Sequence, residues 1–175
     1  MKSYKKIFLF AFLITFTISC ENEDAKIINI DQFSNSGKIL NLEYFKTKGF
    51  KEVKKYDISE LSGALSAHFG WYKDILNNPR DYELRFYKDH ESALSSKKIV
   101  EEVIGENAIL ATRDVTWKEG NSDRRVNRRG AGSGPGSAKA KYLYYLIYEN
   151  TVIMCEGLNE EESMKLCNDL VKYNF

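Results

Sequence analysis

Residues that commonly bind metals or carry out catalysis are scarce in this sequence. It holds two histidines and three cysteines among 175 residues, and none of them stands at the spacing of a zinc site or of the HExxH motif. The glycine-rich stretch 130–136 does not complete a G-x-G-x-x-G phosphate loop, and Ala131 stands where the serine-elbow motif requires glycine. The sequence therefore predicts no metal site and no cofactor, and it identifies no catalytic residue.

The chain also lacks a strong excess of charge and a long apolar run. Its 26 Lys and Arg residues nearly balance its 25 Asp and Glu residues, giving a formal net charge of +1, whereas a dedicated nucleic-acid binder carries a marked positive excess. The apolar run from Ile7 to Ile18 is shorter than the roughly 20 residues that a membrane-spanning helix requires. We therefore expect no nucleic-acid partner, and the run does not fit an ordinary transmembrane helix.

The apolar run belongs to an N-terminal segment with three parts. Lysines at positions 2, 5 and 6 precede it, and the pair Ser19-Cys20 follows it. Residues 1–20 resemble the signal peptide of a bacterial lipoprotein, although Thr17 stands where the lipobox usually has leucine. The resemblance implies that residues 1–19 are removed and that Cys20 carries the acyl chains that hold the protein at a membrane. An uncleaved signal anchor, or a plain signal peptide followed by an unrelated cysteine, would give a similar pattern.

The residues that follow Cys20 are polar and begin with the acidic sequence Glu-Asn-Glu-Asp. Residues 20–36 are predicted to form an acidic, polar tether between the lipid and the domain. By the same resemblance, the absence of aspartate at position 21 implies that the inner-membrane retention signal is missing. We therefore expect a protein of the bacterial cell envelope, anchored by lipid in the outer membrane. The sequence leaves open whether it faces the periplasm or the cell surface.

Residues 37–175 are predicted to form one α+β domain. The spacing of apolar residues and the turn signals predict helices at 37–48, 57–76, 90–104 and 159–173, and strands at 82–87, 108–117, 142–148 and 151–156. Residues 50–56 fit either a short strand or a helical turn. Both faces of segment 142–148 are apolar, so we expect it in the middle of the sheet. The predicted architecture is a single two-layer domain with about four strands, mainly antiparallel, and helices on one face.

Cys155 and Cys167 are predicted to form a disulfide. Cys155 lies on the last predicted strand and Cys167 on the helix that follows. From the connection at Asn159, the strand extends roughly 13 Å back to Cys155, and the helix rises about 12 Å to Cys167. A helix that packs back on its strand therefore brings the two cysteines level. Export to an oxidising compartment permits the bond, and two buried free thiols are the alternative.

A basic, glycine-rich segment at 119–140 is predicted to be a flexible loop, because it has almost no bulky apolar residues. Residues 118–141 hold seven Lys and Arg residues and two acidic residues, a local charge of 7 − 2 = +5. Four arginines suit phosphate or carboxylate ligands, such as lipid headgroups, lipopolysaccharide phosphates or acidic glycans: Arg124, Arg125, Arg128 and Arg129. The alternative is a solvated insertion, or one whose charges pair with the acidic remainder of the chain.

A second candidate binding surface consists of four aromatic residues, although such residues are more often part of a core: Trp71, Tyr72, Tyr87 and Trp117. Together these features favour a non-enzymatic, lipid-anchored envelope protein whose domain binds a ligand or an envelope partner on the sheet face away from the helices. Two alternatives stay open. One is an envelope hydrolase whose site no motif reveals, and the other is a structural assembly factor of the envelope.

Overall fold

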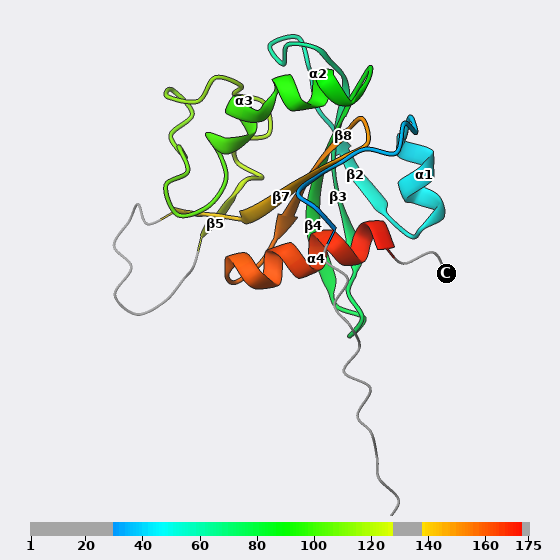
Figure 1. Ribbon diagram of the computed structural model, residues 1–175. Helices are drawn as coiled ribbons and strands as arrows, with labels where there is room; N and C mark the ends of the chain where they lie inside the picture. The colour runs from blue at the N-terminus through cyan, green and yellow to red at the C-terminus, as the bar shows by residue number, and fades with distance from the viewer. Residues whose placement is uncertain (1–29, 128–137, 173–175) are drawn as a thin grey trace, which may run out of the picture.

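A computed structural model describes residues 30–127 and 138–172 of the protein. Its main feature is a six-stranded sheet with the strand order β1-β7-β8-β4-β3-β2 (Figure 1). Within this sheet only β1 and β7 run parallel, and the other neighbouring pairs are antiparallel. The strands are β1 (Phe33–Ser34), β2 (Lys51–Lys55), β3 (Ala64–Lys73), β4 (Pro79–Tyr87), β7 (Tyr142–Tyr148) and β8 (Thr151–Glu156).

A small hairpin and short helices complete the described part of the chain. Strands β5 (Arg125–Asn127) and β6 (Ala138–Ala140) pair only with each other. The helices are α1 (Leu42–Thr47), α2 (His90–Ser95), α3 (Lys97–Glu101) and α4 (Glu160–Lys172), and no described helix is long and apolar enough to cross a membrane. The predicted α+β class and the mainly antiparallel sheet are confirmed, but the main sheet has six strands rather than about four.

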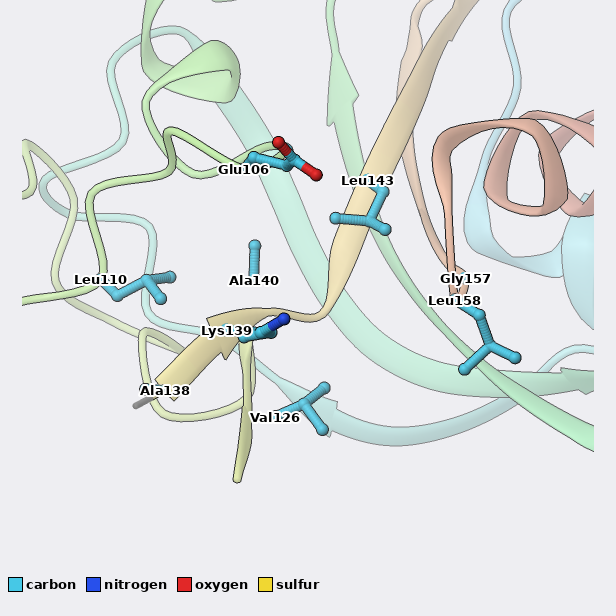
Figure 2. Close-up of a pocket in the computed structure, with 10 residues that line it drawn as sticks. Glu106, Leu110, Val126, Ala138, Lys139, Ala140, Leu143, Gly157 and Leu158 are labelled. Atoms are coloured by element: carbon cyan, nitrogen blue, oxygen red, sulfur yellow. The ribbon is translucent and has the colours of Figure 1, made fainter. Parts of the chain in front are cut away.

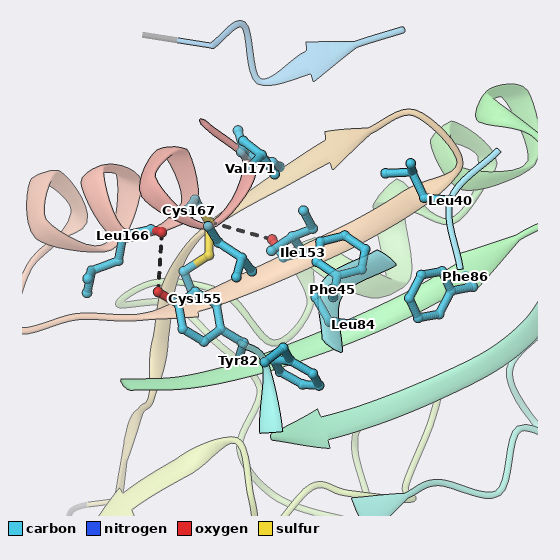
Figure 3. Packing of buried hydrophobic residues seen from close by; sticks show 13 residues of the cluster. Leu40, Phe45, Tyr82, Leu84, Phe86, Ile153, Cys155, Leu166, Cys167 and Val171 are labelled. Carbon is cyan, nitrogen blue, oxygen red and sulfur yellow. Dashed lines mark hydrogen bonds between the residues drawn. A yellow bond between two sulfur atoms is a disulfide. The ribbon is translucent and has the colours of Figure 1, made fainter. Parts of the chain in front are cut away.

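Helices cover both faces of the sheet, so the predicted arrangement with helices on one face is wrong. On β8, Ile153 packs in a cluster with Phe45 of α1 and Val171 of α4 (Figure 3). Its neighbour Met154 points to the opposite face, as successive strand residues do, and packs in a second cluster with Val100 of α3. Strands β7 and β8 are apolar on both faces because they lie between two helical layers. The domain therefore has three layers rather than two.

Several predicted elements are confirmed with shifted ends. Strand predictions 82–87, 142–148 and 151–156 correspond to β4, β7 and β8. β7 lies between β1 and β8, inside the sheet as expected. The helix prediction 159–173 corresponds to α4, the prediction 90–104 to α2 and α3, and the prediction 37–48 to the shorter α1. The ambiguous segment 50–56 forms an edge strand, β2.

The predicted helix at 57–76 is wrong, because this segment forms a turn and then β3. In that turn, Asp57 Oδ1 accepts a hydrogen bond from the backbone of Ser59 (2.9 Å). Gly70 is required where β3 approaches β2, since a Cβ there would lie 2.3 Å from the backbone oxygen of Lys51. Apolar residues bury on both faces of β3, and this produces a spacing that resembles a helix.

The predicted strand at 108–117 is also wrong, because the segment runs through turns and irregular backbone. Val115 and Trp117 are buried in two different clusters. The indole nitrogen of Trp117 donates to the backbone oxygen of Asp57 (3.2 Å). The apolar residues of this segment therefore fix an irregular connection to the sheet instead of forming a strand.

The segments that we predicted to be a polar tether and a flexible loop are partly folded. The backbone of Ile147 donates to the oxygen of Gln32 (2.9 Å) and that of Glu149 to the oxygen of Ser34 (2.8 Å). Residues 30–36 therefore belong to the sheet edge and not to a tether. Within 119–140, the described residues form turns and the β5–β6 hairpin, which corrects the prediction of a flexible loop there. Residues 1–29 and 128–137 lie outside the described part.

Candidate functional site

The candidate ligand site is a pocket of about 400 Å³ beside the β5–β6 hairpin (Figure 2). This volume lies within the range of small-molecule sites. The large apolar residues of the lining are Leu110, Val126, Leu143 and Leu158, and polar atoms form at least as much of its exposed surface as apolar atoms do. Two charged residues also line the pocket, Glu106 and Lys139. The pocket therefore suits a molecule with an apolar body and a polar group.

Four separate segments supply the pocket walls. Leu143 comes from β7, and Val126 comes from β5. The turn after α3 is tied to β7 because the backbone of Gly105 donates to the oxygen of Tyr142 (3.0 Å). Between β8 and α4 the chain turns so tightly that a Cβ on Gly157 would lie 2.7 Å from the backbone nitrogen of Ser163. This turn presents the side chain of the next residue, Leu158, which is 68% exposed.

A buried charge cluster holds one end of the β5–β6 hairpin against β4. The Nε and Nη2 atoms of Arg124 donate to Glu83 Oε2 (2.8 Å) and Oε1 (3.1 Å), and Arg85 Nε donates to the same Oε1 (2.8 Å). All three side chains are fully buried. The guanidinium groups of Arg124 and Arg85 lie 4.3 and 4.7 Å from the ring centre of Trp117. The ring therefore faces two cations that share one carboxylate.

The cluster carries a net positive charge in the protein interior. Burial by itself raises the pKa of Glu83, but Arg124 and Arg85 outweigh it and hold this pKa below its ordinary value. Desolvation and the nearby carboxylates of Glu83 and Asp123 raise the pKa of Tyr56, whose hydroxyl donates to Asp123 (2.9 Å). Among the described residues, Arg85 Nη1 is buried without a hydrogen-bond partner. Arg85 is thus the less completely satisfied of the two arginines.

The other end of the hairpin is also attached to β4. Lys141 Nζ lies 2.6 Å from Asp81 Oδ2, and the backbone of Lys141 donates to the oxygen of Arg124 (2.9 Å). Asp81 and Glu83 are two residues apart on β4, so both ends of the hairpin contact the same stretch of strand. The hairpin that brings Val126 to the pocket is therefore fixed by two ion pairs.

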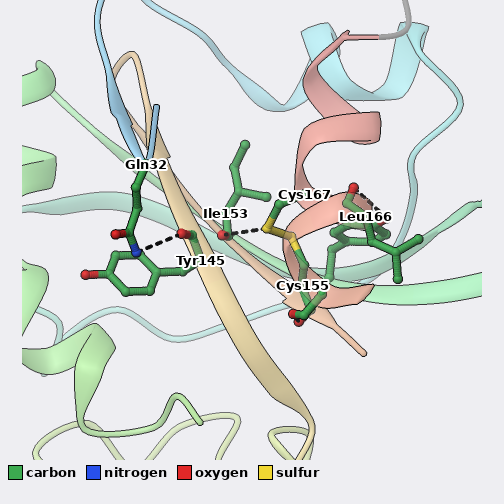
Figure 4. Close-up of a disulfide and its surroundings, with 8 residues drawn as sticks. Gln32, Tyr145, Ile153, Cys155, Leu166 and Cys167 are labelled. Carbon is green, nitrogen blue, oxygen red and sulfur yellow. Dashed lines mark hydrogen bonds between the residues drawn. A yellow bond between two sulfur atoms is a disulfide. The ribbon is translucent and has the colours of Figure 1, made fainter. Parts of the chain in front are cut away.

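The predicted disulfide between Cys155 and Cys167 is confirmed, with a Cα–Cα distance of 5.6 Å (Figure 4). It joins β8 to α4, as the predicted packing of the helix on its strand requires. Close by, the hydroxyl of Tyr82 donates to the backbone oxygen of Leu166 (3.2 Å), which also holds α4 on the sheet. The chain between the two cysteines includes Leu158, so the crosslink fixes the segment that forms one wall of the pocket.

The four predicted arginines do not form one exposed anion-binding surface. Arg124 is buried and paired with Glu83. For this residue the alternative prediction is confirmed, in which charges of the segment pair with the acidic remainder of the chain. Arg125 Nε donates to the backbone oxygen of Asn121 (3.2 Å). Arg128 and Arg129 lie outside the described residues, as does Cys20.

The four predicted aromatic residues do not form one surface either. Tyr87 and Trp117 are buried in different clusters. Tyr72 packs against the cluster beside α1 and α4, with its ring centre 6.5 Å from that of Tyr82, and Trp71 is half-buried on β3. The aromatic residues contribute mainly to packing, which the sequence alone could not distinguish from a binding surface.

The two histidines contact different groups. His68 Nδ1 lies 2.7 Å from Glu52 Oε1, and desolvation lowers the pKa of His68 although Glu52 opposes this. His90 Nδ1 lies 2.6 Å from the backbone oxygen of Glu149. Within the described ranges, no group of three or more His, Cys, Asp and Glu residues is arranged to hold a metal ion.

Sequence reasoning missed the charge cluster, although β4 carries a signal for it. Glu83 and Arg85 lie two residues apart on one face of a strand whose other face is apolar. Such a pattern usually indicates a solvent-exposed face. Here that face is covered by Trp117 and Arg124, which come from segments that the sequence patterns assigned to a strand and to a flexible loop.

Comparison with known proteins gives a family but no activity. No curated protein matches the chain, and no solved structure matches it. One family model, described as a family of unknown function (DUF6810), matches residues 41–174. These residues include the main sheet from β2 onward, all four described helices, the charge cluster and the pocket. The chain therefore belongs to the DUF6810 family.

Proposed function

We propose that this protein is a lipid-anchored protein of the bacterial cell envelope that binds a small molecule with both apolar and polar groups, without transforming it. The N-terminal pattern that ends at Cys20 supports the anchor. The buried disulfide supports export, because such bonds persist in oxidising compartments and are rare in the cytosol. The observation that carries the binding activity is the pocket beside the β5–β6 hairpin.

The pocket lining indicates the class of ligand. Four large aliphatic side chains offer surface to an apolar body, and burial of such surface contributes about 25 cal/mol per Å². Glu106 and Lys139 carry opposite charges, so a polar or zwitterionic group has a partner of either sign. The ion pairs of the hairpin and the nearby disulfide keep these walls in place before the ligand arrives, which reduces the entropy lost on binding.

Titration with N-phenyl-1-naphthylamine, an apolar probe whose fluorescence rises on burial, tests the binding site. Leu143→Asp places a charge in the pocket, whereas Leu65→Asp changes a residue that is 63% exposed and does not line it. Loss of one buried leucine contact is worth about 1.5–3 kcal/mol, so the Leu143 variant should weaken binding at least about tenfold. Equal affinity of the two variants, with unchanged unfolding temperatures, would contradict the assignment of the pocket.

The anchor is tested separately by metabolic labelling with a fatty-acid analogue in a bacterial host. The wild-type chain should incorporate the label and should be recovered in the membrane fraction. The Cys20→Ala variant should lose both properties, because the thiol that carries the lipid is absent. Equal labelling of the two chains would refute the anchor but would leave the pocket assignment standing.

A further inference from the structure

The tip of the β3–β4 hairpin presents two large apolar side chains to solvent. Ile75 and Leu76 are 59% and 75% exposed. They lie between β3 and β4, which pair over their whole length from Ala64 to Tyr87. The tip projects beyond the end of the sheet (Figure 1). Single exposed apolar residues are common on protein surfaces, so the exposure alone does not indicate a function.

The turn that carries these two residues is held by a built network of hydrogen bonds. Asp74, whose side chain is only 7% exposed, accepts from the backbones of Leu76 (2.9 Å) and Asn78 (2.8 Å) through Oδ1 and from Arg80 Nε (3.0 Å) through Oδ2. The backbones of Asp74 and Asn78 are also bonded, with a 2.8 Å distance. Asn77, with φ 67°, closes the turn. The two apolar residues are therefore held outward by a turn of defined shape.

The hairpin tip and the point where the N-terminal segment joins the domain lie at the same end of the sheet. β1 runs parallel to β7, so the residues before Phe33 lie toward the start of β7. The start of β7 lies beside the end of β8, where Tyr144 pairs with Cys155. On the other side of β8, Cys155 pairs with Tyr82 near the start of β4. The hairpin tip directly precedes β4. Ile30, the first described residue, is held at α4 by a hydrogen bond to Asn168 (3.0 Å).

The length of chain between Cys20 and Ile30 is compatible with contact between the tip and a membrane. Ten residues span at most about 35 Å. Leu76 precedes Tyr82 by six residues. At the rise of an extended strand, the tip therefore lies at most roughly 20 Å beyond the level of Tyr82. A membrane that holds a lipid on Cys20 is therefore close enough for the tip to reach it.

We propose that the β3–β4 hairpin tip inserts Ile75 and Leu76 into the surface of the membrane that anchors the protein. This inference rests on the proposed lipid anchor, which places a bilayer within reach of the tip. The two apolar side chains enter the boundary between headgroups and acyl chains, and the Asp74 network keeps the turn rigid at that boundary. Contact at the tip and the tether at Ile30 together orient the domain, so that the opposite end of the sheet faces away from the membrane.

The test uses an environment-sensitive fluorophore on a single introduced cysteine. Residues 21–175 carry an N-terminal histidine tag and are held on phosphatidylcholine vesicles that contain a nickel-chelating lipid, which makes the test independent of Cys20. The label is placed at Leu76→Cys or, as the control, at Leu65→Cys, a residue of similar exposure at the opposite end of the sheet. The native cysteines are joined in the disulfide and do not react.

On vesicles, the label at position 76 should shift its emission to shorter wavelength and should be quenched by a lipid with a nitroxide near the top of its acyl chain. The label at position 65 should show neither effect. Equal responses at the two positions would overturn the proposal, and so would a shift at position 76 that is present before vesicles are added, because that result indicates contact between copies of the protein. A failure of fatty-acid labelling at Cys20 instead refutes the anchor and does not alter this measurement.

Discussion

Removing the negative charge of Glu83 should destabilise the fold more than removing either arginine that pairs with it. Glu83→Gln leaves Arg85 and Arg124 buried side by side without a carboxylate. Breaking a buried ion pair by removal of one partner costs about 3–5 kcal/mol. Because two cations lose their partner at once, we expect a loss at the upper end, about 5 kcal/mol of the free energy of unfolding.

The two arginine variants should rank below Glu83→Gln and in a defined order. Arg124→Met leaves Glu83 with one cationic partner, so the expected loss is about 3 kcal/mol, the lower end of the range. Arg85→Met should cost least, because Arg85 makes one hydrogen bond to the carboxylate whereas Arg124 makes two. Its removal also eliminates the buried Nη1 atom, which has no partner in the described part of the chain.

Urea-induced unfolding, followed by circular dichroism with the disulfide intact, measures these differences. Asp114→Asn serves as the control, because its carboxylate is 52% exposed in a surface pair with Arg113. That variant should change the free energy of unfolding by less than about 0.5 kcal/mol. A loss for Glu83→Gln no larger than that for Arg85→Met would refute the account of the cluster as two cations that depend on one carboxylate.

The same cluster predicts a dependence of stability on pH. The pKa of Glu83 is lowered in the folded protein, so its contribution is fully present above the unfolded-state pKa, about 4.3. This contribution is lost as the pH falls below that value toward the folded-state pKa. Wild-type protein should therefore lose stability in acid more steeply than Glu83→Gln, and parallel acid profiles of the two proteins would contradict the prediction.

Three further variants test the packing of the sheet by the same unfolding assay. Gly70→Ala should cost about 2–3 kcal/mol, because its Cβ would meet the backbone oxygen of Lys51 at 2.3 Å; a neutral result would contradict the close approach of β2 and β3. Replacing both Cys155 and Cys167 with alanine should cost about 3 kcal/mol from loop entropy, and no loss would indicate that α4 is held without the crosslink. Asn150→Ala should cost about 3 kcal/mol, since its buried amide bonds the backbone of Leu40 and Tyr87, and a loss below about 1 kcal/mol would contradict that role.

Local sequence patterns were sufficient to predict an element or a crosslink where one physical constraint determined it. The β7–β8 hairpin follows from two apolar runs separated by a turn signal, α4 follows from the helical spacing of its apolar residues, and the disulfide follows from the rises of the strand and the helix. The segment around β3 has an apolar spacing that resembles a helix, because apolar side chains are buried on both faces of that strand. Gly70 carries the correct signal, since a residue without a side chain is expected where two strands approach closely.

The candidate site could not be derived from the sequence because its parts are distant in the chain. Glu83 and Arg124 are separated by 41 residues, and the folding of the chain back onto β4 brings them together. The pocket likewise joins the turn after α3, the β5–β6 hairpin, β7 and the turn before α4. No local spacing encodes such a combination. The composition of segment 119–140 predicted a flexible loop, and composition does not reveal that Arg124 is buried.

The most direct test of the whole account is the intact mass of the protein purified from the membrane fraction of a bacterial host. We expect a chain that begins at Cys20, carries the added mass of diacylglycerol and an amide-linked acyl group, and contains the oxidised Cys155–Cys167 pair. A chain that begins at Met1, lacks acyl groups and is recovered from the cytosol with three free thiols would contradict the anchor and the proposed envelope function.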